Sequence, residues 1–363
     1  MSALILIAIL VVLIVAHEFG HFIAAKLSGV RVEEFGVGYP PRALTLATIR
    51  GTEYTLNWLP FGGFVRLLEE DGMELDPRAA KRAGSFAAAP RWKQAVILAA
   101  GVFCNVLAGW LLFAGALTVG LPAAVAPETE GAQLIISGVM PGSPADVGGL
   151  RGGDVLLQVS QGGARATLDP EGVSTFIGAR GGKEISFQIE RADVVEEYAV
   201  QPAHAVIPGD ASKPAVGVEL AMVAYTKLPF GEALVEAAEN TWSSLKSIVV
   251  GLGTLIRDAF NAEAKLNTLV GPVGLTSIVG DAAGQGIGQI LALAAFISLN
   301  LAVINLLPIP ALDGGRLVFV GIETIIRRRI PTIVSQILNT VGFLAIVLLM
   351  VAITVQDVAK LVG

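Results

Sequence analysis

The sequence of 363 residues is poor in charged residues, in aromatic residues and in cysteine. Charged residues make up only 15% and aromatic residues 6%, and the one cysteine, Cys104, lies in an apolar stretch. A single cysteine excludes a disulfide or a cysteine-based zinc site within one chain. With 53% hydrophobic residues and a mean hydropathy of +0.69, so little charge excludes a soluble globule of this size. We therefore expect an integral membrane protein.

Basic charge is also scarce, and the net charge is -6. Residues 121–285 contain nineteen acidic and ten basic residues. Proteins that bind nucleic acid present a basic patch or stripe instead. The composition therefore predicts no nucleic-acid partner.

Long apolar runs are what the sequence has in excess. A helix needs about 20 mainly apolar residues to cross a bilayer. Four segments qualify, at residues 2–25, 94–119, 287–307 and 336–355. The first lacks the basic start and the small-residue cleavage site of a secretory signal, so we expect it to be a retained span. The sequence thus predicts a polytopic α-helical membrane protein with about four transmembrane helices.

Basic residues in the short loops predict the orientation of these spans. Residues 26–93 contain ten of the twenty-five basic residues, and the loop between the last two spans contains three arginines at 327–329. Loops rich in Lys and Arg stay in the cytoplasm, whereas long loops cross the membrane with little regard to charge. We expect both termini and residues 121–285 to be extracytoplasmic.

Between the second and third spans, short runs typical of strands are separated by Gly and Pro turns. We predict a β-rich domain over residues 127–204, followed by an extracytoplasmic helical connector over 205–285 that is helical from about Phe230 to Phe260. The "GSPA…GL..GD" arrangement within 136–162 resembles a PDZ domain, a module that binds an extended peptide at a strand edge. An ordinary β-rich fold without a ligand is the alternative.

The N-terminal membrane part, residues 1–126, contains a second β-like segment at 30–70. It includes the apolar, glycine-rich pieces "FGVGYP" and "LPFGGFV". Irregular backbone is tolerated at membrane depth only where protein or a water-filled cavity satisfies it. We expect a membrane-associated β region here, on the cytoplasmic side, and a C-terminal membrane part over 286–363.

The first span contains the motif "HEFGH". His17 and His21 are four residues apart, so on a helix they share one face and can bind one metal ion. Glu18 is adjacent and can take a proton from a metal-bound water without being a ligand. Ionisable residues are costly inside a membrane and usually functional there. The alternative is an interhelical hydrogen-bond cluster without a metal.

A catalytic zinc ion commonly has three protein ligands. The third span ends in "NLAVINLLPIPALDGGRL", where two prolines break the helix and Asp313 follows. With the predicted orientation, Asp313 falls at the same cytoplasmic depth as the two histidines. Asp beside Gly is also common at turns, so a helix cap is the alternative reading of Asp313.

Four motifs occur in order along the chain: "HEFGH", "GSPA…GD", "GPVG" at 271–274 and "NLLPIPALDGG" at 305–315. Together they resemble the site-2 protease family of intramembrane zinc metalloproteases, most closely the bacterial RseP type (regulator of sigma-E protease). The resemblance implies one Zn²⁺ per chain, held by His17, His21 and Asp313, with Glu18 as catalytic base. It also implies that Asn305 binds substrate or polarises the transition state.

The same resemblance implies that the β region holds the substrate extended by strand addition, so Gly62, Gly63 and Phe64 are candidate substrate-binding residues. It implies a single-span membrane protein as substrate, such as an anti-sigma factor or a signal-peptide remnant, pre-cleaved by another protease, with a peptide end bound at the PDZ-like domain. The site would lie toward the cytoplasmic side of the bacterial cytoplasmic (inner) membrane. One departure is that the RseP type has two PDZ domains in tandem, whereas this chain has one such motif.

Two other classes of function would use similar features. A membrane metal transporter also places His and acidic residues in spans, but along a full path and not at one depth. A catalytically inactive PDZ scaffold would explain the insert, but it has no need for Glu18 beside paired histidines.

Overall fold

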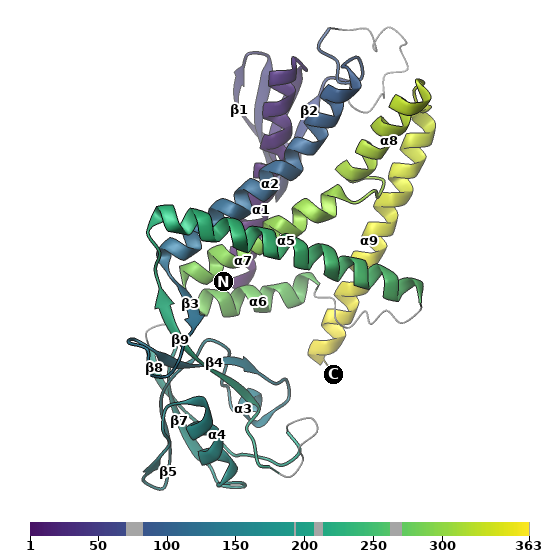
Figure 1. Ribbon diagram of the computed structural model, residues 1–363. Coiled ribbons are helices and arrows are strands. Elements are labelled where there is room, and N and C mark those ends of the chain that lie inside the picture. The colour runs from purple at the N-terminus through teal and green to yellow at the C-terminus, as the bar shows by residue number, and fades with distance from the viewer. Residues whose placement is uncertain (70–82, 192–193, 207–212, 262–270, 363) are drawn as a thin grey trace. The chain divides into compact units, whose positions relative to one another are not determined.

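The computed structural model describes residues 1–69, 83–191, 194–206, 213–261 and 271–362 (Figure 1). Small parts of the expected β region, PDZ-like domain and connector lie outside the described residues, at 70, 192–193, 207–212 and 262–270. The chain divides into two compact units. The first unit comprises Met1–Ala114, Leu234–Val279 and Ala292–Gly363, and the second comprises Gly115–Ala233 and Gly280–Leu291.

Four helices in the described part of the chain are long and apolar enough to cross a membrane (Figure 1). They are α1 (Ser2–Ser28), α2 (Arg91–Val119), α7 (Ile287–Leu306) and α9 (Thr332–Val362). Their positions, lengths and composition match those of the four predicted spans. Three further helices accompany them: α5 (Phe230–Phe260), which confirms the helix expected there, α6 (Pro272–Gly284) and α8 (Asp313–Ile326).

Small residues let α1 and α2 pack closely. A Cβ added at Gly20 would lie 2.4 Å from the backbone oxygen of Ala100. Membrane helices associate through such small-residue contacts, since lipid offers no hydrophobic drive to bring them together. At the end of α1, Gly29 takes a left-handed conformation (φ 77°) and caps the last carbonyls. The chain then turns directly into the first strand.

The strands β1 (Val32–Ile49) and β2 (Thr52–Leu67) form an antiparallel hairpin that folds back on itself. Residues 34–37 pair on both sides with β2, with 53–56 on one side and 63–66 on the other. The buried carboxylate of Glu34 accepts hydrogen bonds from Thr55 and Arg66 and forms an ion pair with Arg42. This folding brings residues 62–65 of β2 against α1.

The segment between α7 and α8 is held by close backbone packing. A Cβ added at Gly314 would lie 2.2 Å from the oxygen of Leu307, so only glycine fits where α8 turns back against the end of α7. The side chain of Asn339, in α9, accepts a hydrogen bond from the backbone of Ala311 at 3.2 Å. Asp313 is the first residue of α8, so its place in space is fixed by both neighbours.

The second unit is built on a seven-stranded sheet with the order β3-β9-β4-β5-β7-β8 and β6 paired to β5. The strands are β3 (Leu121–Ala124), β4 (Gln133–Val139), β5 (Val155–Gln161), β6 (Ala164–Arg165), β7 (Ile185–Arg191), β8 (Val194–Val200) and β9 (Val218–Thr226). The helices α3 (Pro144–Val147) and α4 (Pro170–Gly178) belong to the same unit.

The sheet extends beyond the expected domain at 127–204. Strand β9 lies in the stretch predicted to be a helical connector, so that connector is only partly helical. Strand β9 inserts between β3 and β4, which precede it by about 80 residues or more. Pairing between segments so far apart cannot be inferred from local sequence patterns.

The residues of the "GSPA…GD" motif have structural roles in this unit. The Ser143 hydroxyl accepts a hydrogen bond from the backbone of Asp146 and caps α3. Asp154 is buried and receives two hydrogen bonds from Arg191, each 2.7 Å, and one from the backbone of Arg151 at 2.8 Å. The hydrogen bonds to Asp154 raise the pKa of the Arg191 guanidinium.

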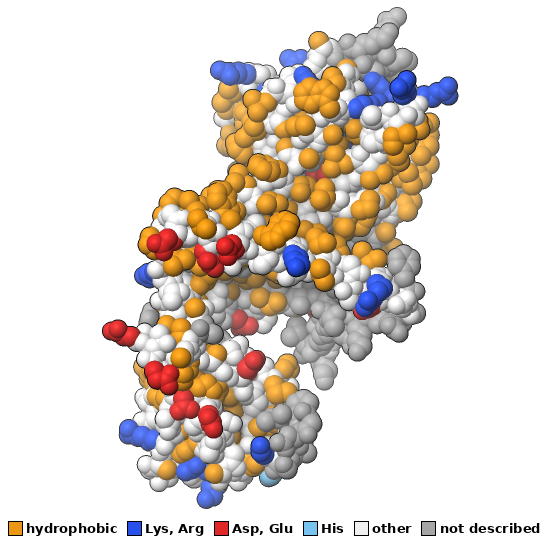
Figure 2. All heavy atoms as spheres, viewed as in Figure 1, with side chains coloured by type: hydrophobic (Ala, Val, Ile, Leu, Met, Phe, Trp, Pro, Cys, Tyr) orange, Lys and Arg blue, Asp and Glu red, His pale blue; other side chains and the backbone are white. Residues whose placement is uncertain are grey.

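Apolar and basic side chains occupy different parts of the surface of the first unit. On the face shown in Figure 2, hydrophobic side chains cover the long helices, and Lys and Arg side chains gather at the end where the hairpin and α8 lie. At this end Arg91 forms an ion pair with Glu323 (2.7 Å), and Lys93 donates to the backbone oxygen of Ser28 (2.7 Å). Basic residues thus join α1, α2 and α8 at one end of the unit.

Candidate metal centre

Three side chains from two distant parts of the sequence converge in the first unit. The Asp313 Oδ2 atom lies 2.9 Å from His17 Nε2 and 3.2 Å from His21 Nε2, and the two Nε2 atoms are 3.1 Å apart. Both histidines are buried, and the Asp313 side chain is 14% exposed. Among the described residues these three form the group of His, Cys, Asp and Glu side chains that could hold a metal ion.

The spacing of these atoms fits a tetrahedral zinc ion. Zinc bonds of about 2.0 to 2.1 Å at tetrahedral angles separate ligand atoms by about 3.3 Å. The three observed separations of 2.9, 3.1 and 3.2 Å are close to this value. Two imidazoles and one carboxylate are also a donor set that zinc accepts, with a fourth position left for water or substrate.

The carboxylate of Glu18 lies at the edge of the same site. Its Oε2 atom accepts a hydrogen bond of 3.1 Å from the backbone N–H of Val65, in β2. A cavity of about 180 Å³ is lined by Glu18 and His21 of α1, by Asp313 and Arg316 of α8, and by residues of β2 and α2. Glu18 and two of the three converging side chains, those of His21 and Asp313, therefore line one cavity, and His17 lies directly behind them.

The three predicted hairpin residues lie beside this part of α1. Cβ atoms built at the two glycines would contact α1: one at Gly62 would come within 2.9 Å of Ile14, and one at Gly63 would lie 3.9 Å from Glu18. Phe64 lines the cavity. The structure thus brings Gly63 and Phe64 to the site, whereas Gly62 lies beside Ile14, earlier in α1.

Asn305 is placed differently. It lies in the last turn of α7 and is partly buried. In the described part of the chain it makes no hydrogen bond to the three converging side chains and does not line the cavity. Its expected role in substrate binding stays a prediction.

Two polar residues at the site were not among the sequence-predicted ones. Asn105, in α2, is fully buried, and its side chain lies 3.2 Å from His17 Nδ1. Arg316 follows Asp313 by three residues in α8 and lines the cavity. Because Asn105 is a polar residue in the middle of an apolar span, the sequence alone could have marked it as a candidate. Arg316 could not be found in this way, because its place at the site depends on where α8 begins.

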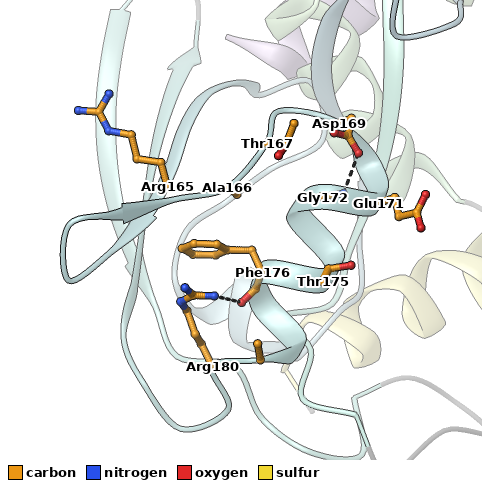
Figure 3. A pocket seen from close by; sticks show the side chains of 10 residues that line it. Arg165, Ala166, Thr167, Asp169, Glu171, Gly172, Thr175, Phe176 and Arg180 are labelled. Carbon is orange, nitrogen blue, oxygen red and sulfur yellow. Dashed lines mark hydrogen bonds between the residues drawn. The ribbon is translucent and has the colours of Figure 1, made fainter.

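A second cavity lies in the second unit, beside α4 (Figure 3). Its polar groups are engaged in the local fold. Asp169 accepts a hydrogen bond from the backbone of Gly172 and caps α4, while Arg180 stacks on the ring of Phe176 and donates to its carbonyl. This cavity carries no comparable cluster of reactive groups.

Comparisons with known proteins identify the family. The model of peptidase family M50 matches residues 5–349. The chain belongs to peptidase family M50. This is the site-2 protease family, whose members are membrane-embedded and whose general function is intramembrane proteolysis, so this peptidase is a zinc metalloprotease.

Several relatives of this peptidase carry the name "Putative zinc metalloprotease". One from Clostridium perfringens is 34% identical over 95% of both chains. One from a Nostoc species is 32% identical over 99% of this chain and 97% of its own, and one from Campylobacter jejuni is 30% identical over 97% and 91%. The likeness thus covers both units.

Proposed function

We propose that this peptidase hydrolyses peptide bonds in or near the transmembrane segments of single-span membrane proteins. His17, His21 and Asp313 are the zinc ligands, one ion per chain, and Glu18 is the general base. The observation that carries this proposal is the convergence of three ligand atoms at a cavity that Glu18 and residues of strand β2 also line.

Each residue contributes one part of the reaction. A zinc ion held by His17, His21 and Asp313 would supply a Lewis acid, able to lower the pKa of a water molecule and to polarise the scissile carbonyl. Glu18 takes the proton from the attacking water and gives it to the leaving amine. The N–H of Val65 holds the carboxylate of Glu18 in place from the strand side. We assign Asn305, at the end of α7, to binding the substrate or its developing oxyanion.

The hairpin provides a way to hold the substrate. A transmembrane helix hides its peptide bonds in its own hydrogen bonds, so the substrate must be extended before hydrolysis. Residues 63–66 of β2 pair with β1 on one side, and residues 64, 65 and 67 line the cavity. An extended peptide can add to this edge through backbone hydrogen bonds, with Gly62, Gly63 and Phe64 beside it.

The site is proposed to face the cytoplasm, in a multi-pass protein of a bacterial cytoplasmic membrane. The basic residues at the end of the first unit support this orientation. With Cys104→Ala as background, a cysteine at Lys183 should react with an impermeant maleimide added outside the cell, and one at Arg328 should not. The reverse pattern would overturn the orientation.

The second unit is proposed to bind a peptide end exposed by an earlier cleavage. On β9, Val218 to Ala221 pair with β4 on one side, and among the described strands none pairs with them on the other. The helix α4 contacts β9. A strand edge beside a helix is an arrangement that accepts a peptide by strand addition. Trimmed substrates, such as an anti-sigma factor or a signal-peptide remnant, are the candidates.

The alternatives differ in what Glu18 does. A metal transporter or an inactive scaffold gives no cleavage with either glutamate or glutamine at this position. The test compares wild type with Glu18→Gln, using a purified single-span substrate and measuring zinc content in the same samples. We expect cleavage to fall by about 10²- to 10⁴-fold while zinc stays bound. Full cleavage by Glu18→Gln with zinc bound would show that the mechanism is wrong.

A further inference from the structure

One face of α2 carries a row of three residues, called the stripe below, that has the same four-residue spacing as the two histidines of α1. Ile97, Gly101 and Asn105 are four residues apart, as are His17 and His21. Residues at this spacing lie one above the other, about one helical turn apart. The Nε2 atoms of both histidines belong to the metal centre, and their Nδ1 atoms contact α2 instead.

The contact of His21 with this stripe fixes its tautomer. His21 Nδ1 lies 2.8 Å from the backbone oxygen of Ile97. A carbonyl oxygen can only accept a hydrogen bond, so Nδ1 must carry the proton. His21 Nε2 is then left with a lone pair directed at the metal centre.

The contact of His17 with the stripe is made by an amide side chain. Asn105 Nδ2 is placed 3.2 Å from His17 Nδ1, and Asn105 Oδ1 is a buried atom without a hydrogen-bond partner among the described residues. The oxygen and nitrogen of an amide are assigned from the hydrogen-bond network, and exchanging them gives His17 Nδ1–H an acceptor. His17 is then in the same tautomer as His21.

We propose that Asn105 is a positioning residue for the metal centre, whose side-chain oxygen accepts the Nδ1 proton of His17 and so directs His17 Nε2 at the metal. This inference rests on the proposed function, in which His17 is a zinc ligand. Metal-bound histidines almost always donate their second N–H to such a partner, and losing it typically weakens metal binding by about 10- to 100-fold.

A purely structural role for Asn105 is the competing explanation. Its backbone oxygen accepts a hydrogen bond of 2.8 Å from the hydroxyl of Ser298, in α7, and both residues are fully buried. That bond joins α2 to α7 but uses the main chain of Asn105, which any residue at 105 keeps. The side chain is therefore directed at His17 and not at the helix contact.

The lack of a side chain at Gly101 allows α2 to approach the two histidine rings of α1 closely. A Cβ at this position would lie 2.4 Å from His21 Nε2 and 2.7 Å from His17 Cε1. Only glycine lets the stripe approach both rings. Gly101→Ala therefore displaces the rings without removing a polar group, and it should also weaken zinc binding.

The test measures zinc affinity of the full-length protein in detergent by competition with a chromophoric chelator. Asn105→Leu removes the amide, whereas Asn105→Asp keeps only acceptor oxygens. We expect Asn105→Leu to bind zinc about 10- to 100-fold more weakly, and Asn105→Asp to keep wild-type affinity or exceed it. The visible absorption of the Co²⁺-loaded protein should shift in Asn105→Leu and be retained in Asn105→Asp.

The matched control is Asn300→Leu, an equal change on α7 where the amide donates to Phe296 in its own helix. It should bind zinc like wild type. Wild-type affinity in Asn105→Leu, or a loss in Asn105→Asp as large as that in Asn105→Leu, would overturn the inference. If Asn105→Leu does not fold, Asn105→Asp decides alone, since a loss of zinc affinity there contradicts an acceptor role.

His17→Ala separates this inference from the proposed function. If His17→Ala binds zinc as tightly as wild type, the proposed ligand set fails whatever Asn105 does. If His17→Ala loses zinc and the Asn105 variants match wild type, only the role of Asn105 fails.

Discussion

Each of the two units contains an aspartate with little exposure to solvent, and the partners of the two carboxylates differ in kind. In the second unit, Asp154 is surrounded by donors, with Arg191 and the backbone of Arg151 within 2.8 Å. In the first unit, Asp313 meets two histidine nitrogens that can act as ligand atoms. Matched donors and acceptors stabilise a fold, whereas converging lone pairs require a cation between them. The partners of a buried carboxylate therefore indicate whether its role is structural or chemical.

The largest expected effect on the structural cluster comes from Arg191→Met. It leaves the buried carboxylate of Asp154 without its cation, and breaking such a pair typically costs about 3 to 5 kcal/mol. We expect amides of β5 and β7 to exchange with solvent much faster in hydrogen-exchange mass spectrometry, with zinc binding unchanged. The double variant Asp154→Leu/Arg191→Met should recover much of the lost protection, because the uncompensated charge is gone.

A smaller effect is expected at the contact between β2 and the base. Val65→Pro removes the backbone N–H that donates a hydrogen bond to the carboxylate of Glu18. A hydrogen bond to a charged group contributes about 1.5 kcal/mol or more, which corresponds to a fall of about tenfold or more in the cleavage rate. Zinc content should not change. Val65→Ala keeps the N–H and should cleave nearly as fast as wild type, and equal rates for the two variants would exclude this role of Val65.

The smallest effect is expected at the cap of α3. Ser143→Ala removes the hydroxyl that accepts from Asp146, and losing such a cap costs about 1 kcal/mol. Hydrogen exchange should increase locally around α3, and cleavage of a trimmed substrate should stay at the wild-type rate. A fall in cleavage comparable to that of Glu18→Gln would mean that the motif around Ser143 acts in catalysis and not only in folding.

Much of the candidate site could be predicted from the sequence because its signals are local. The apolar runs define the spans, the spacing of His17 and His21 defines a shared face, and the charge bias places Asp313 at the same depth. Asn105 could not be assigned a role, because the sequence does not say which face of α2 meets α1. That face is decided by glycines such as Gly101, which act through close packing and leave no periodic pattern.

The fold was predictable to a similar degree. The spans follow from continuous apolar runs, and the helix at Phe230–Phe260 follows from the helical pattern of its residues. Both signals lie within one segment of the sequence. The double pairing of residues 34–37 in the hairpin and the insertion of β9 between β3 and β4 depend on contacts between separated segments. Strand order of this kind is set by packing of the whole unit, so the sheet extends past the boundary at 204.

One crossed experiment tests the central claim most directly. Zinc affinity and hydrogen exchange of β5 and β7 are measured together in Asp313→Asn and Asp154→Asn. We predict that Asp313→Asn binds zinc at least about tenfold more weakly with wild-type exchange, and that Asp154→Asn binds zinc normally with faster exchange. Wild-type zinc affinity in Asp313→Asn would contradict the assignment of the converging cluster as the metal centre.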